Sequence, residues 1–226
     1  MNRGFEVKRL YILAGALLGL GLAGPVSAQD AMVPVYAMQH AQKGDVEAMR
    51  ALLADHPDYV MRSSMVSDVR AVSELLGMAA IAPNASLEMI ELLVESGADP
   101  DAQPTLSNGA PGLSPLQYAL SGTVYDRPEG EKMFRNQVAL GSIPDARATP
   151  EERLRIIQYL IDNGADPNRS TLMANAVLAG PDYVRVLIEG GADPNPVSDN
   201  GASLLEMYRA TVTLYEQRLA LLEAQS

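Results

Sequence analysis

Apolar residues recur at helical spacing along most of the chain. Between residues 87 and 96, positions 87, 90, 93 and 94 are apolar and share one helix face, while the glutamates at 88, 91 and 95 share another. Similar segments predict helices at 35–41, 46–53, 72–80, 114–121, 149–163, 170–176 and 181–190. The pattern therefore predicts an all-α fold.

Three of these helices end in nearly the same five residues. The motif is Gly-Ala-Asp-Pro-Asp at 97–101 and Gly-Ala-Asp-Pro-Asn at 164–168 and 191–195. A glycine just past a helix adopts the left-handed conformation that closes the last carbonyls, and a proline three residues later cannot donate the next helical hydrogen bond. Asp and Asn beside the proline can hydrogen-bond the nearby backbone. Each copy therefore predicts a helix end followed by a fixed turn.

The spacing of the three motifs indicates a repeated unit. Their glycines are 67 and 27 residues apart, about two units and one shortened unit of a roughly 33-residue period. Before the second motif, the octet Gly-Leu-Ser-Pro-Leu-Gln-Tyr-Ala at 112–119 is similar to the ankyrin signature Gly-x-Thr-Pro-Leu-His-x-Ala, with Ser for Thr and Gln for His. The chain thus resembles an ankyrin-repeat protein of the exported bacterial type.

This resemblance implies a solenoid of four to five helix-turn-helix units within residues 29–226. Unit one lacks the glycine motif, as expected of an atypical N-terminal cap. Unit three is interrupted by roughly 29 extra residues, about 121–148, in which 130–140 is expected to form a short helix. Because the flanking helices match the family pattern, we expect the fold not to require this insertion. The second helix of unit three begins at Thr149, which is predicted to form a capping box with Glu152.

The C-terminal segment, about 202–226, continues the helical pattern without a glycine motif. Apolar residues recur at 204, 208, 212, 215, 219 and 222. We interpret this stripe as a helix that covers the last unit, with a coiled-coil dimer seam as the alternative. On the first interpretation the protein is expected to be a monomer.

The first 28 residues have the three parts of a secretory signal peptide. Basic residues precede an apolar run at 10–24, and small residues at 26–28 precede Gln29. The run is shorter than the roughly 20 residues that span a bilayer, so we expect cleavage after Ala28 rather than a membrane anchor. The predicted location is the periplasm or the medium.

Charge and composition narrow the classes of partner. The chain has a net charge of −11 and residues 1–28 carry +2, so the rest carries −13, which disfavours nucleic acid and anionic membrane surfaces. A basic protein patch is a more plausible partner. There is no cysteine, and the two histidines, His40 and His56, lie in different segments. With no motif for hydrolysis, phosphate binding or metal ligation, we expect no catalysis, cofactor or metal site.

The resemblance implies a protein-binding scaffold that uses its loops, called fingers, and the first helix of each unit. The alternative is a protective or inhibitory partner of a secreted or envelope enzyme or toxin. Within the insertion, the basic residues at 127, 132, 135 and 147 either fold back on acidic surface or help to present apolar side chains to a client. The candidate partner-binding residues are Thr105, Leu106, Asn108, Gln117, Arg127, Met133, Phe134, Met173, Asp199 and Asn200.

Overall fold

The computed structural model describes residues 28–61, 69–106, 108–197, 201–210 and 212–213. Within these ranges the chain is helical and has no β-strand; its extended segments form two isolated bridges, Thr105 with Pro111 and Val197 with Ser203. The predicted all-α fold class is therefore confirmed. None of the described helices combines the length and apolar character needed to cross a bilayer. The predicted signal peptide lies outside the described residues except for Ala28.

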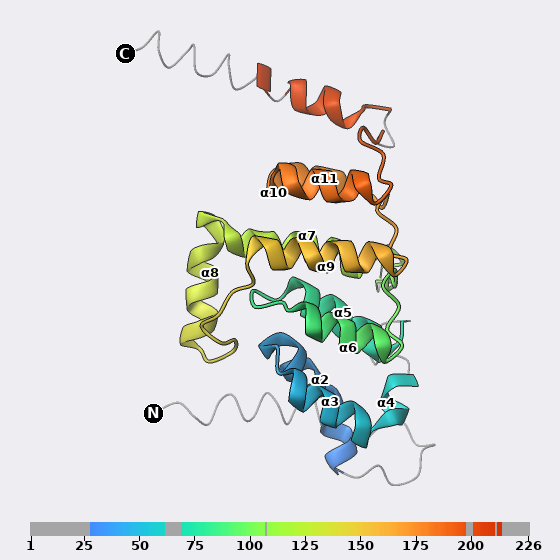
Figure 1. Cartoon of the computed structure of the whole chain (residues 1–226), viewed down its shortest axis with the longest axis vertical. Coiled ribbons are helices and arrows are strands. Elements are labelled where there is room, and N and C mark those ends of the chain that lie inside the picture. The colour runs from blue at the N-terminus through green and yellow to red at the C-terminus, as the bar shows by residue number, and fades with distance from the viewer. Residues whose placement is uncertain (1–27, 62–68, 107, 198–200, 211, 214–226) are drawn as a thin grey trace.

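Most helices form consecutive pairs (Figure 1). The pairs are α2 (Ala28–Lys43) with α3 (Val46–Asp55), α5 (Ala71–Ile81) with α6 (Leu87–Glu95), α7 (Pro115–Ser121) with α9 (Pro150–Asp162), and α10 (Leu172–Ala179) with α11 (Pro181–Glu189). The short helix α4 (Pro57–Met61), which the sequence pattern did not predict, follows α3. Residues 204–210 form a further helix above α10 and α11 in Figure 1.

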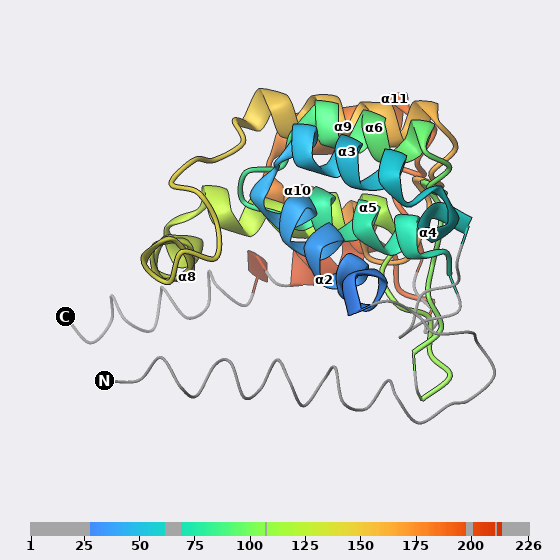
Figure 2. The same ribbon diagram turned by 90° about the horizontal axis from the view of Figure 1, so that it is seen from below.

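The pairs stack as layers around one continuous apolar core. The first helices, α2, α5, α7 and α10, pack in one row, and the second helices, α3, α6, α9 and α11, pack in another (Figure 2). We call these rows the inner and outer helices. The core extends from Val33 to Leu204 and includes Leu93 and Leu187, both fully buried. Each layer therefore buries its apolar faces against its neighbours.

The three glycine motifs end their helices in the same way. Gly97, Gly164 and Gly191 have φ values of 95°, 103° and 95°. After α6, the backbone N–H of Gly97 donates to Val94 and that of Ala98 donates to Leu93, and the equivalent pairs of bonds follow α9 and α11. This is the Schellman arrangement, in which a left-handed glycine lets the chain satisfy carbonyls at the end of the helix. The turn geometry predicted from the motif is thus present in all three copies.

The turns are also bonded to one another. Within each motif, the first Asp side chain accepts a 2.9 Å hydrogen bond from the backbone N–H two residues later. The last Asp or Asn of each motif accepts a bond from the next layer. Together with Ser73, these side chains form a ladder of hydrogen bonds that are 2.7 to 3.0 Å long. The four bonds are Asp99 N to Ser73 Oγ, Asp166 N to Asp101 Oδ1, Asp193 N to Asn168 Oδ1, and Leu205 N to Asn195 Oδ1.

The helix caps differ from the prediction in one respect. Thr149 Oγ1 accepts from Glu152 N as expected, but the Glu152 carboxylate accepts from Leu87 N at 2.8 Å instead of bonding back to Thr149. The predicted capping box at Thr149 is therefore wrong, because Glu152 is used to join α9 to the start of α6. A complete capping box, which the sequence analysis did not predict, joins Ser114 and Gln117.

The insertion forms a small lobe with its own apolar core. The 3-10 helix η2 (Gly122–Asp126) continues from α7, and α8 (Pro128–Ala139) packs against η2 and stands beside the stack (Figure 1). Tyr125, Phe134 and Ile143 form the core of the lobe. The helix predicted at 130–140 is present and starts two residues earlier.

The lobe is tied to the stack by an ion pair between a buried arginine and a partly exposed aspartate. Arg153 on α9 is 1% exposed, and its Nε lies 3.0 Å from Asp126 Oδ2, while its Nη2 donates to Pro83 O at 3.0 Å. Replacing 123–145 would remove Asp126 and leave this arginine buried without its charge partner, which is costly. The expectation that the fold does not need the insertion conflicts with this arrangement, since the insertion supplies a core contact of α9.

The described part of the C-terminal helix contacts the stack over a narrow stripe. Leu204 is buried, and the Tyr208 hydroxyl donates to Ala174 O at 3.2 Å. Val212, assigned to the same stripe from the sequence, is 54% exposed. The positions 215, 219 and 222 lie outside the described residues. The stripe therefore covers the last layer at its first two positions, Leu204 and Tyr208.

Candidate functional site

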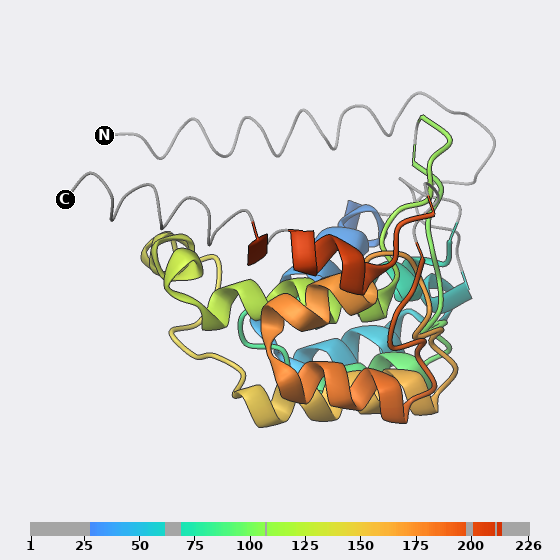
Figure 3. The ribbon, with the colours of Figure 1, turned by 90° about the horizontal axis from the view of Figure 1, so that it is seen from above.

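A groove lies where α5 and α7 meet the loop 102–113, which we call the finger. The N–H groups of Leu106 and Gly112 close the finger as a hairpin by donating to Ala110 O and Pro104 O. In Figure 3 the finger, in light green, projects beyond the row of inner helices. The finger groove consists of two pockets that share Val69, Ser73 and Ala102. The first is also lined by Arg70, Asp99, Asp101, Gln103 and Arg169, and the second by Glu74, Gly77, Met78, Pro104, Leu113, Pro115 and Tyr118.

Close packing at two glycines shapes the apolar side of the groove. A Cβ atom at Gly77 would lie 2.8 Å from the Tyr118 ring, so the absence of a side chain lets this ring lie against α5. On the finger, a Cβ atom at Gly112 would lie 2.8 Å from Pro104 Cγ. Leu113 lies beside them and is 39% exposed. The groove therefore presents aromatic and aliphatic surface that is held in place.

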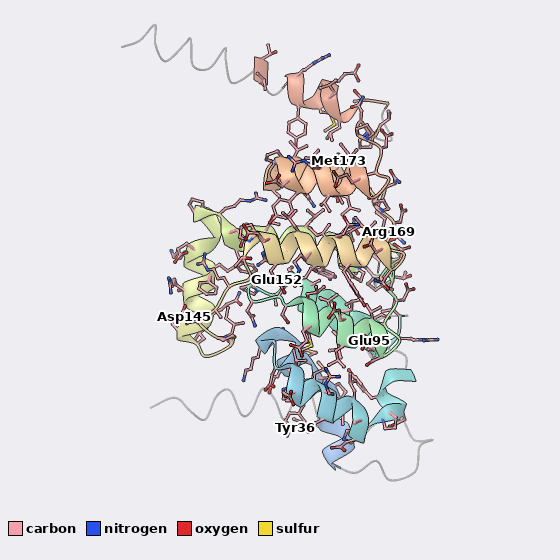
Figure 4. All side chains as sticks on the ribbon, in the orientation of Figure 1. Tyr36, Glu95, Asp145, Glu152, Arg169 and Met173 are labelled. Carbon is pink, nitrogen blue, oxygen red and sulfur yellow. The ribbon has the colours of Figure 1, made fainter. Side chains whose placement is uncertain are left out.

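The polar side of the groove is organised by Arg169. Its Nε donates to Asp101 Oδ1 at 2.8 Å, its Nη2 pairs with Asp101 Oδ2, and its Nη1 donates to Gln103 Oε1 at 2.8 Å. Gln103 Nε2 in turn donates to Gly112 O across the base of the finger. Arg169 lies at the turn edge of the stack (Figure 4). It therefore fixes the finger to the turn of the following layer.

Arg169 also controls the ionisation of its partner. Partial burial by itself would raise the pKa of the Asp101 carboxyl. The hydrogen bonds from Arg169 and from the Asp166 N–H, with the charge of Arg169, outweigh burial and lower this pKa below its ordinary value. The pKa of Arg169 is raised, first by the hydrogen bond to Asp101. The pair therefore stays ionised at neutral pH and serves as a fixed link in the structure.

Charge is distributed unevenly between the two rows of helices. The inner helices α5, α7 and α10 together contain one charged residue, Glu74. The outer helices α3, α6, α9 and α11 each contain at least three. The acidic character of the chain is therefore concentrated on the outer row and the turns, and the inner face is nearly neutral.

Three candidate residues lie on the finger, as the resemblance implied. Thr105 and Asn108 are exposed, and Leu106 is 49% exposed. Asn108 Oδ1 accepts from Ala110 N at 3.0 Å, which shapes the tip. Exposure makes these residues accessible, although they lie at the rim and not among the lining of the groove.

Two candidate partner-binding residues on inner helices are buried, and their assignment as contact residues is therefore wrong. Gln117 is 3% exposed because its side chain is used twice, accepting from Ser114 N at 2.8 Å and donating to Ser170 O at 2.8 Å. Met173 is 4% exposed and belongs to the main core. Both positions lie one residue past the first core leucine of their helix and point between layers. Asp199 and Asn200 lie outside the described residues.

The insertion also corrects the prediction. Phe134 is 1% exposed and cannot be presented to a client, because it fills the core of the lobe beneath the Arg147 guanidinium, 3.9 Å from the ring centroid. Met133 is 42% exposed and stays accessible. Arg127 is half-buried and donates to Thr123 Oγ1 at 3.1 Å.

The basic residues of the insertion are largely paired inside it. Arg135 binds Glu131 at 2.7 Å and Asp145 at 3.1 Å, and Arg147 also pairs with Glu131. These hydrogen bonds, from Arg135 first and then Arg147, lower the pKa of Glu131. Arg135 and Arg147 thus fold back on acidic residues of the protein itself, the first of the two uses expected from the sequence, and these acidic residues belong to the insertion.

Sequence reasoning missed the residues that line the groove, above all Met78, Leu113 and Tyr118. A signal was available in the register of the repeats. Ser73 of α5 and Gln117 of α7 are buried polar residues at equivalent positions of their units. Glu74 and Tyr118 directly follow them, so these two residues also occupy equivalent positions. Aligning the units on the buried residue would have placed them on the inner face.

The described residues include no group of three or more His, Asp or Glu side chains arranged to hold a metal ion. No protein-family model matches this chain, and no curated protein matches it either.

Proposed function

We propose that this chain is an ankyrin-repeat array that binds another protein. The proposal is supported by the signature-like octet at 112–119 and by three glycine motifs with a common turn geometry. It is also supported by helices arranged as inner and outer rows with a finger between layers. The units are 29–61, 69–101, 102–168, 169–195 and 196–213 in this proposal.

The binding surface in this proposal is the finger groove with the adjacent inner face. The observation that carries it is the contrast in charge: the chain is strongly acidic, yet α5, α7 and α10 contain a single charged residue, Glu74. The apolar side of the groove presents exposed Leu113 and half-buried Tyr118. Fixed aromatic and aliphatic side chains are the usual anchors of protein interfaces, and charged residues are depleted at their centre. With the predicted signal peptide, the partner would be a periplasmic or secreted protein.

The test is site-specific photo-crosslinking in cells that produce the protein. A photoreactive phenylalanine analogue is placed at Leu113 or at Tyr118, and as a control at Arg155, which is exposed on the outer helix α9. We expect a discrete crosslinked band from the two groove positions and none from Arg155. Leu113→Asp, combined with the probe at Tyr118, should weaken the band, since it introduces charge into an apolar contact.

A band from Arg155 alone would move the interface to the outer helices and contradict the proposal. Absence of a band from any position, with the folded protein present in the periplasm, would also count against a stable protein partner. Peptide sequencing of the exported form should begin at Gln29. An intact Met1 in the membrane fraction would contradict the predicted export.

A further inference from the structure

The two pockets of the finger groove differ in size and in the groups that line them. The pocket around Met78, Leu113 and Tyr118, which we call the apolar pocket, has a volume of about 120 Å³. The pocket around Asp99 and Arg169, which we call the polar pocket, has a volume of about 680 Å³ and is more open. Because an apolar cavity of about 150 Å³ admits a group of the size of benzene, the apolar pocket admits one aliphatic side chain.

The apolar pocket is shaped by residues that cannot readily move away. Pro104 on the finger and Pro115 at the start of α7 line it, and their rings restrict the backbone. Tyr118 lies against Gly77, where a Cβ atom would be 2.8 Å from the ring. Met78 is the adaptable member of the lining, because its unbranched side chain adjusts to the group that enters. An aliphatic side chain of a partner therefore meets a preformed pocket.

Carboxylates outnumber basic groups around Arg169 in the polar pocket. The hydrogen bond to Asp101 raises the pKa of Arg169 most, and the charges of Asp101, Asp166 and Asp99 raise it further. Three carboxylates thus act on one guanidinium. Its Nε, Nη1 and Nη2 are already bonded to Asp101 and Gln103, whereas Asp99 is exposed. The net charge beside Arg169 is therefore negative.

The remaining charged groups of the groove do not change this sign. Arg70 precedes the first residue of α5 and Glu74 lies in its first turn, so the two contribute opposite charges. The whole chain carries a net charge of −11, and a cleft with an excess of one charge concentrates groups of the opposite charge. The polar pocket therefore favours a basic side chain of a partner over an acidic one.

The two pockets lie about one helical turn apart along α5. Arg70 lines only the polar pocket, Gly77 and Met78 line only the apolar pocket, and Ser73 lines both. Ser73 and Gly77 are four residues apart, which is about 6 Å along the helix. In an extended segment, residues i and i + 2 point to the same side and lie about 6.6 Å apart. An extended segment that runs along α5 therefore places one side chain in each pocket when a single residue separates them.

We propose that the finger groove binds an extended peptide segment that carries a lysine or arginine and an aliphatic residue two positions apart. The aliphatic side chain fills the apolar pocket, and the basic side chain contacts Asp99 in the polar pocket. The backbone of the segment runs along α5 beside the finger. This proposal rests on the proposed protein-binding function and adds the chemistry of the partner.

The test is selection from a random peptide library displayed on phage, with the purified protein in the form in which it accumulates in cells as the target. We expect the enriched peptides to share Lys or Arg two positions from Leu, Ile, Val or Met. One enriched peptide is then labelled and its binding is measured by fluorescence anisotropy. Replacing its basic residue by Gln should weaken binding by about three-fold, and replacing its aliphatic residue by Ala should weaken binding by about five-fold or more.

Asp99→Asn tests the acidic contact without changing the turn. Asp99 Oδ1 accepts from Asp101 N at 2.9 Å, and the amide oxygen of Asn can accept the same bond. Asp193→Asn is the matched control, because Asp193 is also exposed and accepts the equivalent 2.9 Å bond from Asn195 N, but it does not line the groove. Asp99→Asn should weaken binding by about three-fold and abolish the difference between the basic peptide and its Gln version. Asp193→Asn should leave binding unchanged.

Peptides of another kind would overturn the proposal. Enrichment of acidic residues, or of peptides without the two-position spacing, would contradict the chemistry assigned to the pockets. Equal weakening by Asp99→Asn and Asp193→Asn would show that the basic residue does not contact Asp99. If no peptide is enriched although Leu113 and Tyr118 crosslink a partner in cells, this proposal fails and the protein-binding function stands. If these positions give no crosslink either, both proposals fail.

Discussion

Asn168 Oδ1 accepts a 2.7 Å hydrogen bond from the backbone N–H of Asp193, which lies 25 residues later in the next turn. The same side chain donates through Nδ2 to Gly191 O at 3.2 Å. One amide therefore satisfies a donor and an acceptor of the neighbouring turn. Because the accepting bond is repeated at Asp101 and Asn195, the turn edge links consecutive layers in addition to the apolar core.

Removal of this amide should therefore destabilise the stack. Asn168→Ala is expected to lower the free energy of unfolding by about 1 kcal/mol, since two exposed hydrogen bonds are lost. Urea denaturation followed by circular dichroism measures the change. Asn136→Ala, on the exposed side of α8, is the control and should change stability by less than about 0.5 kcal/mol. Equal effects of the two substitutions would contradict a role for the ladder.

Backbone conformation gives two predictions of opposite sign. Gly191 has φ of 95° and open space around its Cα, so Gly191→Ala should destabilise by about 1 to 2 kcal/mol through strain alone.

Thr171, at the shortened start of α10, has φ of 71°, which is unfavourable for a β-branched residue. Thr171→Gly should therefore stabilise the protein by about 0.5 kcal/mol or more. Thermal unfolding measures both changes, and a shift of the same sign in the two variants would contradict the prediction.

The insertion should contribute to stability through Asp126. Asp126→Asn leaves the Arg153 guanidinium buried without a charge partner, and we expect a loss of about 3 kcal/mol. A double-mutant cycle with Arg153→Met should give a coupling energy of about 1 kcal/mol or more. Additive effects in the cycle would show that the two side chains do not interact. Replacing 123–145 with a short Gly-Ser link should cost at least as much as Asp126→Asn, in contrast to the expectation from the sequence.

The link between Asp101 and Arg169 should make stability depend on pH in acid. The pKa of Asp101 is lowered in the folded state, so its ionisation favours the folded state at pH values above its unfolded pKa, near 3.8. That contribution is lost as the pH falls through the lower folded pKa. The difference in urea midpoint between wild type and Asp101→Asn should be constant at pH 5 to 7 and shrink toward pH 2. A difference that does not change with pH would contradict the ion pair.

Most of the layered fold could be predicted from local sequence, because its signals act over a few residues. The glycine motifs determine where α6, α9 and α11 end, since a left-handed glycine and a following proline stop a helix whatever surrounds it. Helical periodicity located the helices of each pair to within about three residues, except for the start of α2, which lies seven residues before the predicted start at 35. Residues 31–34, expected to be extended, belong to α2. The insertion was found because it interrupts a regular spacing. The candidate finger residues were placed correctly for a similar reason, since short loops between layers are exposed.

Only the tertiary structure decided which polar and aromatic residues are buried. Gln117 resembles a surface residue in the sequence, but its amide joins two layers whose chain positions are 53 residues apart. Phe134 packs with Tyr125 of η2 and Ile143 of the lobe, and Arg153 pairs with Asp126 of η2. Burial at these positions follows from how separate segments meet, which no local pattern encodes. The finger groove has the same origin, because its walls come from two helices and a loop that become adjacent only when the layers stack.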